Sequence, residues 1–568
     1  MRFKKLFLIL IILIAGFLRF YKLRELPPGF HVDEVSFGYN AYSLMRIGKD
    51  ENGNFFPLYI DTFGDQRPAG YFYLTIPAIK IFGLNEFAVR FPSAFFGVLA
   101  VWLVYFLVNK LIENFSAAYY ISIIASFLLA ISPWHITISR ATSEASVALF
   151  LILAGVYLFL CGLERQRKVD FLFSLLLFFI SYYFYHTPRV FVPLLIFGVT
   201  ILYWQKLETQ KTKNTSLIFL IICLVVSFLT IALGPGTARF KQVSIFNNPG
   251  VQLRLDEQIR EEFRGTNIYL VRLFHNKLVN YGREILSNYT KHFAFDFLFL
   301  NGGLPMRYRI PEMGLLHLVE VPFLLLGIIL LLKERMNLSW LMIYWLLIGP
   351  VAVSLTQEDV PNVQRSLFML PSFQVITAYG FYKSVTFLKR KNWRMVLIIF
   401  SILGLGFNFS YFCHQYLVHQ RVYRPWFRNY GLKELVNEIN RVDSQYERIV
   451  FTKAHNDPYI YILFYNQYDP ETYQRYHSLR SSDRWGFEKY VFHPTDCPSH
   501  QKEEIFRDGK ALFVDKGECK AMPYTQTLKI ISREDNTPVF RLLEVNKYEA
   551  EVYFRQQEKL ILKNGEEK

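Results

Sequence analysis

The sequence predicts a mainly α-helical, polytopic membrane protein of about eleven transmembrane helices, followed by a small extracytoplasmic α/β domain. Hydrophobic residues make up 52% of the 568 residues and charged residues only 19%, which lies outside the range of ordinary soluble proteins. About eleven apolar runs approach the roughly 20 residues that a helix needs to cross a bilayer. After residue 413 these runs give way to amphipathic and alternating segments that are typical of a soluble fold.

The predicted spans are apolar runs separated by short polar segments. The first follows the basic start MRFKK and has no small-residue cleavage site behind it, so we interpret it as an uncleaved span rather than a signal peptide. The segment 71–83, YFYLTIPAIKIFG, is too short and too interrupted to span, and we expect an interfacial or re-entrant helix there. The spans are expected near residues 5–23, 88–108, 117–132, 144–162, 171–186, 190–204, 216–234, 314–332, 338–355, 364–386 and 394–412.

The formal net charge of +16 comes partly from short basic clusters between the spans, at MRFKK, ERQRK, QKLETQKTK, LKERMN and LKRKNWR. An alternating path through the membrane places all five clusters on one side, which is the positive-inside pattern and argues against a nucleic-acid surface. We therefore expect a multi-pass membrane protein with a cytoplasmic amino terminus. The richness in Lys and Ile and the compact outer loops favour a prokaryote, and hence the plasma (inner) membrane. This path gives a transmembrane domain, 1–413, with outer loops at 24–87 and 235–313, and an extracytoplasmic domain, 414–568.

Carboxylates and arginines gather at the predicted outer ends of the spans. Charged groups there normally face a protein interior or a water-filled cavity, and helix ends that donate several arginines suit an anionic ligand. For each of these residues taken alone, an ordinary solvated loop charge is equally expected. For Arg140 and Arg365, a lipid-headgroup contact or a salt bridge between loops is likewise an equal alternative to a ligand contact. The candidate site residues are His31, Asp33, Glu34, Asp65, Arg67, Arg140, His186, Arg189 and Arg365.

The region after 413 mixes one amphipathic helix, LKELVNEINRVDSQ, with the β-like runs RIVFTKA, ALFVDKG, TLKIIS and VFRLLEV. Its aromatic stretch DPYIYILFYNQYDPETYQRY is interpreted either as a carbohydrate- or membrane-facing surface or as a packed core helix. A disulfide between Cys497 and Cys519 is one outcome if this region lies outside the cell. The chain has no CxxC pair, Gly-rich phosphate loop, HExxH or GxSxG motif.

Two segments carry a family resemblance. HVDEVSFGYNAY after the first span, and then DQRPAGYFYLTIPAIKIFGLNEFAVRFPSAFFGVLAVWLVY, resemble the amino-terminal signature of the GT-C superfamily of glycosyltransferases. The nearest families are the protein O-mannosyltransferases and the bacterial enzymes that transfer aminoarabinose to lipid A (glycosyltransferase families 39 and 83). The resemblance covers about residues 5–110.

The resemblance implies transfer of a hexose or pentose from a polyprenyl-phosphate donor to a glycan, lipid or protein acceptor on the outer face of the membrane. Asp33 matches the catalytic carboxylate and Glu34 its acidic neighbour. Arg67 stands where the relatives commonly have Lys before Pro, a residue that contacts the donor phosphate. Asp65 stands where an acidic residue has been linked to a metal, so a divalent metal is the one cofactor considered. Arg for Lys, and Ala69 for a second Pro, depart from the family pattern.

The chemistry of an inverting transfer needs one base, because a lipid phosphate is already a good leaving group. We predict that Asp33 is this base and that Glu34 orients a partner or binds a cation. Arg67, with Arg140, Arg189 or Arg365, is expected to neutralise the departing phosphate. We interpret His31 and His186 as supporting hydrogen-bonding residues.

Two other classes of protein stay open at this point. One is a transporter or flippase of polyprenyl-linked lipids or glycans, although charges near mid-membrane and paired halves are more typical of transporters. The other is a noncatalytic glycan-assembly protein, for which Asp33 would be dispensable.

Overall fold

The computed structural model describes residues 2–112, 115–204, 210–232, 237, 242–262, 265–334, 337–453, 457–476 and 486–566. Its residues form two compact units. Unit 1 comprises Met1–Leu23, Leu58–Tyr71 and Arg90–Leu417. Unit 2 comprises Arg24–Pro57, Phe72–Val89 and Val418–Lys568.

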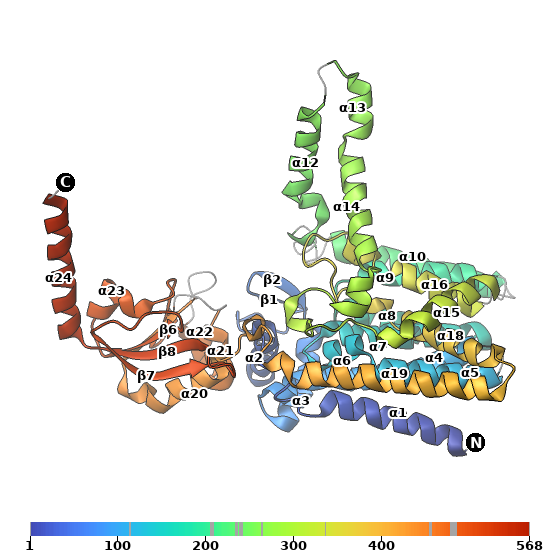
Figure 1. Ribbon diagram of the computed structural model, residues 1–568, viewed down its shortest axis with the longest axis horizontal. Coiled ribbons are helices and arrows are strands. Elements are labelled where there is room, and N and C mark those ends of the chain that lie inside the picture. The colour runs from blue at the N-terminus through green and yellow to red at the C-terminus, as the bar shows by residue number, and fades with distance from the viewer. Residues whose placement is uncertain are drawn as a thin grey trace. The chain divides into compact units, whose positions relative to one another are not determined.

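A helix overlaps each of the eleven predicted spans, so the mainly helical class is confirmed (Figure 1). Three helices of the described residues, Glu86–Leu111, Glu144–Arg165 and Lys391–Arg421, are long and apolar enough to cross a membrane, and the bent pair Ala117–Ile131 and Pro133–Arg140 would make a fourth. The number of eleven spans stays a prediction. The overlapping helices are α1 Arg2–Phe20, α4 Glu86–Leu111, α5 Phe115–Ile131, α7 Glu144–Arg165, α8 Lys168–Tyr182, α9 Pro188–Leu202, α10 Gln210–Ala232, α15 Val321–Glu334, α16 Asn337–Ile348, α18 Ser372–Phe387 and α19 Lys391–Leu417.

Small residues bring some of these helices into close contact. Between α15 and α18, a Cβ atom at Gly327 would collide with the carbonyl of Ile376, and one at Gly380 with the carbonyl of Phe323. Such close backbone approach is how helices pack where lipid removes the hydrophobic driving force.

Unit 1 also contains shorter elements that carry candidate residues. A two-stranded antiparallel hairpin joins β1 Tyr59–Thr62 to β2 Asp65–Pro68. The segment 133–140 is the short helix α6 Pro133–Arg140, and α17 Val351–Ser354 follows α16. The long predicted loop is largely helical and contains α12 Pro249–Arg260, α13 Ile268–Phe274 and α14 Lys277–Lys291. Figure 1 shows α12 standing out from the bundle beside α13 and α14, which follow one another end to end.

Unit 2 contains a six-stranded mixed sheet with the strand order β4-β5-β3-β6-β8-β7. Strand β3 runs parallel to β5 and β6, and the other pairs are antiparallel. The central strands β3 and β6 are almost entirely buried, which explains their continuous apolar runs. The strands are β3 Arg448–Thr452, β4 Gly486–Phe487, β5 Tyr490–His493, β6 Ala511–Lys516, β7 Thr525–Ser532 and β8 Pro538–Val545.

The predicted α/β character of the carboxy-terminal region is thereby confirmed. The predicted amphipathic helix is α20, with Leu432, Leu435 and Ile439 on its buried face. Cys497 and Cys519 form a disulfide, with their Cα atoms 5.8 Å apart. The helices of unit 2 are α2 Val32–Ile47, α3 Gly70–Phe82, α20 Leu432–Val442, α21 Tyr459–Tyr465, α22 Pro470–Tyr476, α23 Lys502–Phe506 and α24 Lys547–Glu566.

The two units differ from the predicted division at residue 413. Most of the first outer loop belongs with the carboxy-terminal region. The aromatic stretch that follows Asp457 explains this, because it forms the buried helix α21, which packs against α2. For α21, the packed core helix is therefore the correct one of the two interpretations, and the aromatic run serves as the inner surface of unit 2.

Candidate active site

Asp33 lies in the first turn of α2, and His31 caps this helix. The Nδ1 atom of His31 accepts the Asp33 backbone N–H at 3.2 Å, and the Glu34 carboxylate accepts the His31 N–H at 3.2 Å. This reciprocal arrangement is a capping box, and carboxylates are favoured in the first turn by the helix dipole. The sequence His-Val-Asp-Glu therefore begins a helix and leaves the Asp33 carboxylate 16% exposed, with its Oδ2 atom 3.5 Å from His31 Nδ1.

Glu34 differs from Asp33 in its surroundings. It is only 4% exposed, and its carboxylate is committed to the cap. The buried phenol of Tyr461 on α21 donates to the Phe30 carbonyl at 2.7 Å. Burial, and then the nearby charges of Glu34 and Asp33, raise the pKa of Tyr461 well above its ordinary value, so this phenol stays a donor. Of the two adjacent carboxylates, Asp33 is the more exposed.

The rest of unit 2 fixes the position of α2. The Asn429 side chain accepts the Val32 N–H at 3.3 Å. Asn40 and Glu51 exchange two hydrogen bonds, of 2.8 and 3.1 Å, and Tyr459 of α21 donates to the Glu51 carboxylate at 3.2 Å. Helix α2 is thus held by Asn429, which lies 397 positions after Val32, as well as by its own loop.

Gly38 on α2 provides a test of this packing. A Cβ atom there would collide with the ring of Phe464 on α21 and lie 2.8 Å from a methyl of Val89. We expect Gly38→Ala to destabilise unit 2 by about 1–3 kcal/mol through overpacking. Thermal unfolding of the detergent-solubilised protein measures this, with Gly16→Ala as control because a Cβ at Gly16 meets nothing within 4 Å. Equal melting of both variants and the wild type would contradict the packing.

Arg67 lies on the β1–β2 hairpin, where it pairs with Ile60. Its Nε atom is 3.5 Å from Asp65, and its Nη1 atom is 3.8 Å from the carboxylate of Glu144 at the start of α7; the Arg67 side chain is 20% exposed. Asp65 is therefore an ion-pair partner of Arg67. Among the described residues, no group of three or more His, Cys, Asp or Glu side chains could hold a metal ion. Asp65 and its neighbours therefore do not fit a bound metal, and the metal-binding role predicted for Asp65 stays untested.

Glu144 and Gln364 are site residues to which the sequence assigned no role. The second Glu144 oxygen accepts from the Gln364 amide at 3.2 Å, and the same amide contacts the Ser143 hydroxyl at 3.3 Å. An acidic residue at the first position of an apolar helix was the available signal for Glu144. Gln364 gave none, because its role depends on a contact 220 residues away.

Arg189 also contacts the hairpin, through Tyr59. Arg189, at the start of α9, donates to the Tyr59 hydroxyl at 2.9 Å and to the Tyr182 carbonyl at 3.2 Å. Tyr59 and Ile60 are adjacent on β1, opposite Pro68 and Arg67. His186 is half-buried, and its carbonyl accepts the Arg189 N–H at 3.1 Å. Arg67 and Arg189 are thus the two candidate arginines joined through one element.

Arg140 and Arg365 have other acceptors in the structure. The buried Arg140 donates to the carbonyls of Leu18 and Tyr21 at 2.7 Å each, and lies over the ring of Tyr416. Arg365 donates to Thr356 and to the Glu358 carbonyl, both at 3.0 Å. Arg140 therefore joins α6 to the end of α1, whereas Arg365 orders its own loop.

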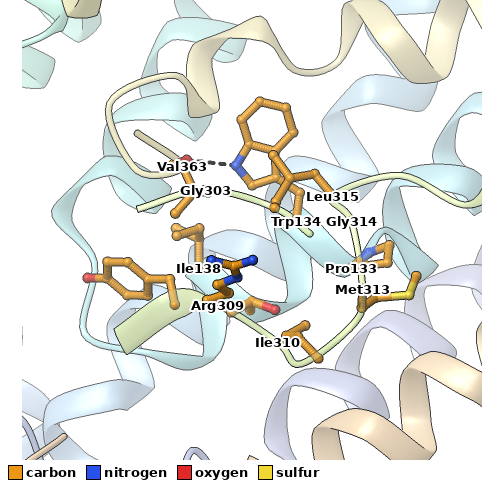
Figure 2. A pocket seen from close by; sticks show the side chains of 13 residues that line it. Pro133, Trp134, Ile138, Gly303, Arg309, Ile310, Met313, Gly314, Leu315 and Val363 are labelled. Carbon is orange, nitrogen blue, oxygen red and sulfur yellow. Dashed lines mark hydrogen bonds between the residues drawn. The ribbon is translucent and has the colours of Figure 1, made fainter. Parts of the chain in front are cut away.

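The loop before α18, residues 356–366, adjoins a small cavity in unit 1. Figure 2 shows Trp134 of α6 donating to the Val363 carbonyl, a bond of 2.7 Å, and the Arg309 side chain lying among the residues that line the cavity. Arg309 was not among the predicted site residues, and its Nη1 atom lies 3.9 Å from the Met306 sulfur. Gln364 follows Val363 directly, so this cavity and the Arg67–Glu144 pair share one loop.

The same loop depends on a neutral histidine. His292 donates from Nδ1 to the Asn288 carbonyl at 2.8 Å, and its Nε2 accepts the Asn362 N–H at 3.1 Å. Burial lowers the pKa of His292 from 6.5 to about 4. The pKa of His292 is lower in the folded protein than in the unfolded chain, so the neutral ring stabilises the fold fully above pH 6.5. This stabilisation is lost as the pH falls toward 4.

We expect protonation of His292 to lower the free energy of unfolding by roughly 3 kcal/mol between pH 6.5 and pH 4. Thermal unfolding at pH 7 and pH 4.5 measures it. The matched variant His292→Gln keeps an amide acceptor but does not titrate, so its melting temperature should change less between the two pH values. An equal change in both proteins would assign the acid sensitivity to other groups.

Comparison with known proteins gives a family match for part of the chain. Residues 66–228 match the model of the dolichyl-phosphate-mannose-protein mannosyltransferase family. The predicted resemblance to this family is confirmed over that segment. The matched residues include Arg67, Arg140, His186 and Arg189 and do not include His31, Asp33, Glu34, Asp65 or Arg365.

A curated relative and two solved structures extend this finding. The "Putative mannosyltransferase YkcB" of Bacillus subtilis strain 168 is 26% identical over 166 residues, which is 28% of this chain and 21% of YkcB. ArnT from Cupriavidus metallidurans, in its structure with undecaprenyl phosphate, aligns with a TM-score of 0.53 and 10% identity over 94% of this chain and 97% of ArnT. The oligosaccharyltransferase AglB from Archaeoglobus fulgidus gives a TM-score of 0.48 and 13% identity, over 81% of this chain and 63% of AglB.

These comparisons differ in what they establish. The ArnT alignment shows a shared fold over nearly the whole of both chains, and with the apolar helices it identifies a multi-pass integral membrane protein. This chain spans about a fifth of YkcB and less than two thirds of AglB. The fold is therefore similar to that of ArnT, and the activity of this chain has to be argued from its site residues.

Proposed function

We propose that this protein is a membrane glycosyltransferase that moves a sugar from a polyprenyl-phosphate donor to an acceptor on the outer face of the membrane. The observation that carries the proposal is the mannosyltransferase family match at residues 66–228, in a chain that aligns with the fold of ArnT over 94% of its length. That match begins at the hairpin that bears Arg67. The structure of ArnT with undecaprenyl phosphate supports a polyprenyl phosphate as the lipid part of the donor.

Asp33 is the proposed general base. The acceptor oxygen or nitrogen attacks the anomeric carbon, and its proton moves to the Asp33 carboxylate. The bond from the anomeric carbon to the phosphate oxygen breaks, and its electron pair leaves with the lipid phosphate. Attack opposite the leaving group inverts the anomeric configuration, so one carboxylate is sufficient. The partial exposure of Asp33 and the committed hydrogen bond of Glu34 support this division of roles.

Arg67 is the proposed phosphate ligand, and Arg189 assists it. Both are positioned by the β1–β2 hairpin. A guanidinium presents a planar fork that matches phosphate oxygens, and positive charge close to the leaving group stabilises it most in the transition state. Glu144 and Asp65 would hold the Arg67 fork before the donor binds. We assign the phosphate to Arg67 and Arg189 because both contact the β1–β2 hairpin, and the phosphate roles of Arg140 and Arg365 stay predictions.

The proposed orientation places the amino terminus in the cytoplasm and the α2 helix, the β1–β2 hairpin and the sheet of unit 2 outside, in a prokaryotic plasma membrane. The five basic clusters of the sequence support this path. The Cys497–Cys519 disulfide supports an outer, oxidising location for unit 2.

A transfer assay tests the proposed function. The full-length protein in detergent is incubated with radiolabelled polyprenyl-phosphate mannose, glucose or aminoarabinose and with a membrane extract as the source of acceptor. We expect label to move from at least one donor into an acceptor fraction. Donor binding without transfer would support a flippase or a glycan-assembly protein instead. A parallel reaction with EDTA examines the metal, because loss of transfer there would return Asp65 to the candidates for a metal ligand.

A further inference from the structure

A cavity distinct from the one in unit 1 lies in unit 2, at one end of the sheet. A cavity of about 510 Å³ is formed where β6, β7 and β8 meet α23 and the first turn of α24. Its volume is within the range of about 300–1,000 Å³ that small-molecule sites occupy. None of its lining residues belongs to the candidate active site.

The charged groups around this cavity balance one another. Lys510 and Glu544 form an ion pair of 2.9 Å, and the Lys547 ammonium donates to the carbonyls of Arg507 and Gly509 at 2.8 and 3.3 Å. With Glu549 the lining has two cationic and two anionic side chains. A phosphate or nucleotide site would show an excess of arginine or lysine, so this balance favours a ligand without net charge.

Two amide side chains line the same cavity, above buried aromatic residues. Gln526 brings a group that both donates and accepts hydrogen bonds, and Asn546, whose side-chain oxygen accepts the N–H groups of Tyr548 and Glu549, brings a donor. Phe513 and Tyr524 are 1% exposed and belong to the apolar cluster beneath them. The buried Tyr524 hydroxyl has no hydrogen-bond partner among the described residues, and burial raises the pKa of Tyr524 to about 12, so it stays protonated. A cavity with several donors and acceptors above a buried apolar cluster suits a molecule with many hydroxyls.

We propose that this cavity binds a neutral oligosaccharide. A sugar ring presents hydroxyls that donate and accept at once, and these match the alternating ammonium, carboxylate and amide groups of the rim. As the glycan part of the acceptor, this ligand would be held by unit 2 during transfer, an assignment that rests on the proposed function.

Gln526→Trp and Thr527→Trp are the matched test variants. Both residues are exposed on the edge strand β7, but Gln526 lines the cavity and Thr527 does not. Successive side chains of a strand point to opposite faces, and tryptophan is tolerated well in strands, so both variants should fold. The tryptophan at 526 fills the cavity and the one at 527 leaves it open.

Binding is measured on the full-length protein by saturation-transfer NMR with mannotriose, maltotriose and N-acetylchitotriose, and with inorganic phosphate as competitor. We expect saturable binding of at least one trisaccharide, a tenfold or greater loss in Gln526→Trp, and no loss in Thr527→Trp or with phosphate. No binding of any of the three, equal binding by both tryptophan variants, or competition by phosphate would each overturn the proposal.

The variant Asp33→Asn separates this proposal from the proposed function. If both are correct, Asp33→Asn binds the trisaccharide as the wild type does and transfers no sugar. Trisaccharide binding in a wild-type protein that never transfers sugar would refute the transferase and keep the glycan site. Full transfer to glycan acceptors by Gln526→Trp would refute the role of this cavity in acceptor binding and keep the transferase.

Discussion

Asp33→Asn is expected to lower the turnover number of sugar transfer by about 10²–10⁴-fold, which is the usual loss when a general base is removed. Asparagine has the shape of aspartate but cannot accept the proton of the attacking hydroxyl at neutral pH. The change leaves the His31 cap intact, since that cap uses the backbone N–H of residue 33. The fold and the donor affinity should therefore remain close to those of the wild type.

The control for this prediction is the neighbouring carboxylate. Glu34→Gln keeps an oxygen that can accept the His31 N–H, and we expect transfer within a few-fold of the wild type. Single-turnover transfer from radiolabelled donor, with donor affinity measured in parallel, compares the two variants. A tenth or more of wild-type turnover in Asp33→Asn would remove Asp33 as the base. A larger loss in Glu34→Gln than in Asp33→Asn would transfer that role to Glu34.

The helices and the carboxy-terminal sheet could be predicted because their signals are local. An apolar run of sufficient length indicates a helix in lipid, and the runs ALFVDKG and VFRLLEV have the length and composition of strands. The capping role of His31 and Glu34 depends on residues three apart. Signals of this kind can be recognised without knowing which distant segments meet.

The grouping of α2 with the carboxy-terminal region could not be predicted, because it depends on contacts between distant residues. Tyr461 and Phe30 are 431 positions apart, and nothing near either residue identifies the other. The arginines show the same limit. Arg67, Arg140 and Arg365 look alike as basic residues near helix ends. Only the tertiary structure directs Arg140 to the Leu18 carbonyl, Arg365 to its own loop, and Arg67 to two carboxylates.

Arg67→Ala is expected to lower turnover by about 10²–10³-fold, the loss usually seen when one donor to a developing negative charge is removed. The deletion also takes a cation away from Asp65 and Glu144, which then repel an incoming phosphate. Donor affinity should therefore fall together with turnover. Arg67→Lys keeps the charge but loses the planar fork, and we expect an intermediate loss of roughly tenfold.

A second substitution separates phosphate binding from the ion pairs of Arg67. Glu144→Gln removes one carboxylate next to Arg67 and retains an amide that can contact Gln364. If Arg67 binds the donor phosphate, Glu144→Gln alone lowers transfer only a few-fold, and the double variant stays as inactive as Arg67→Ala. If Arg67 serves only to neutralise Glu144, the double variant regains transfer close to that of Glu144→Gln. Steady-state transfer over a range of donor concentrations distinguishes these results, and melting temperatures verify that each variant is folded. If Arg67 binds the phosphate, the loss of transfer caused by Arg67→Ala is the same with Glu144 or with Gln at position 144.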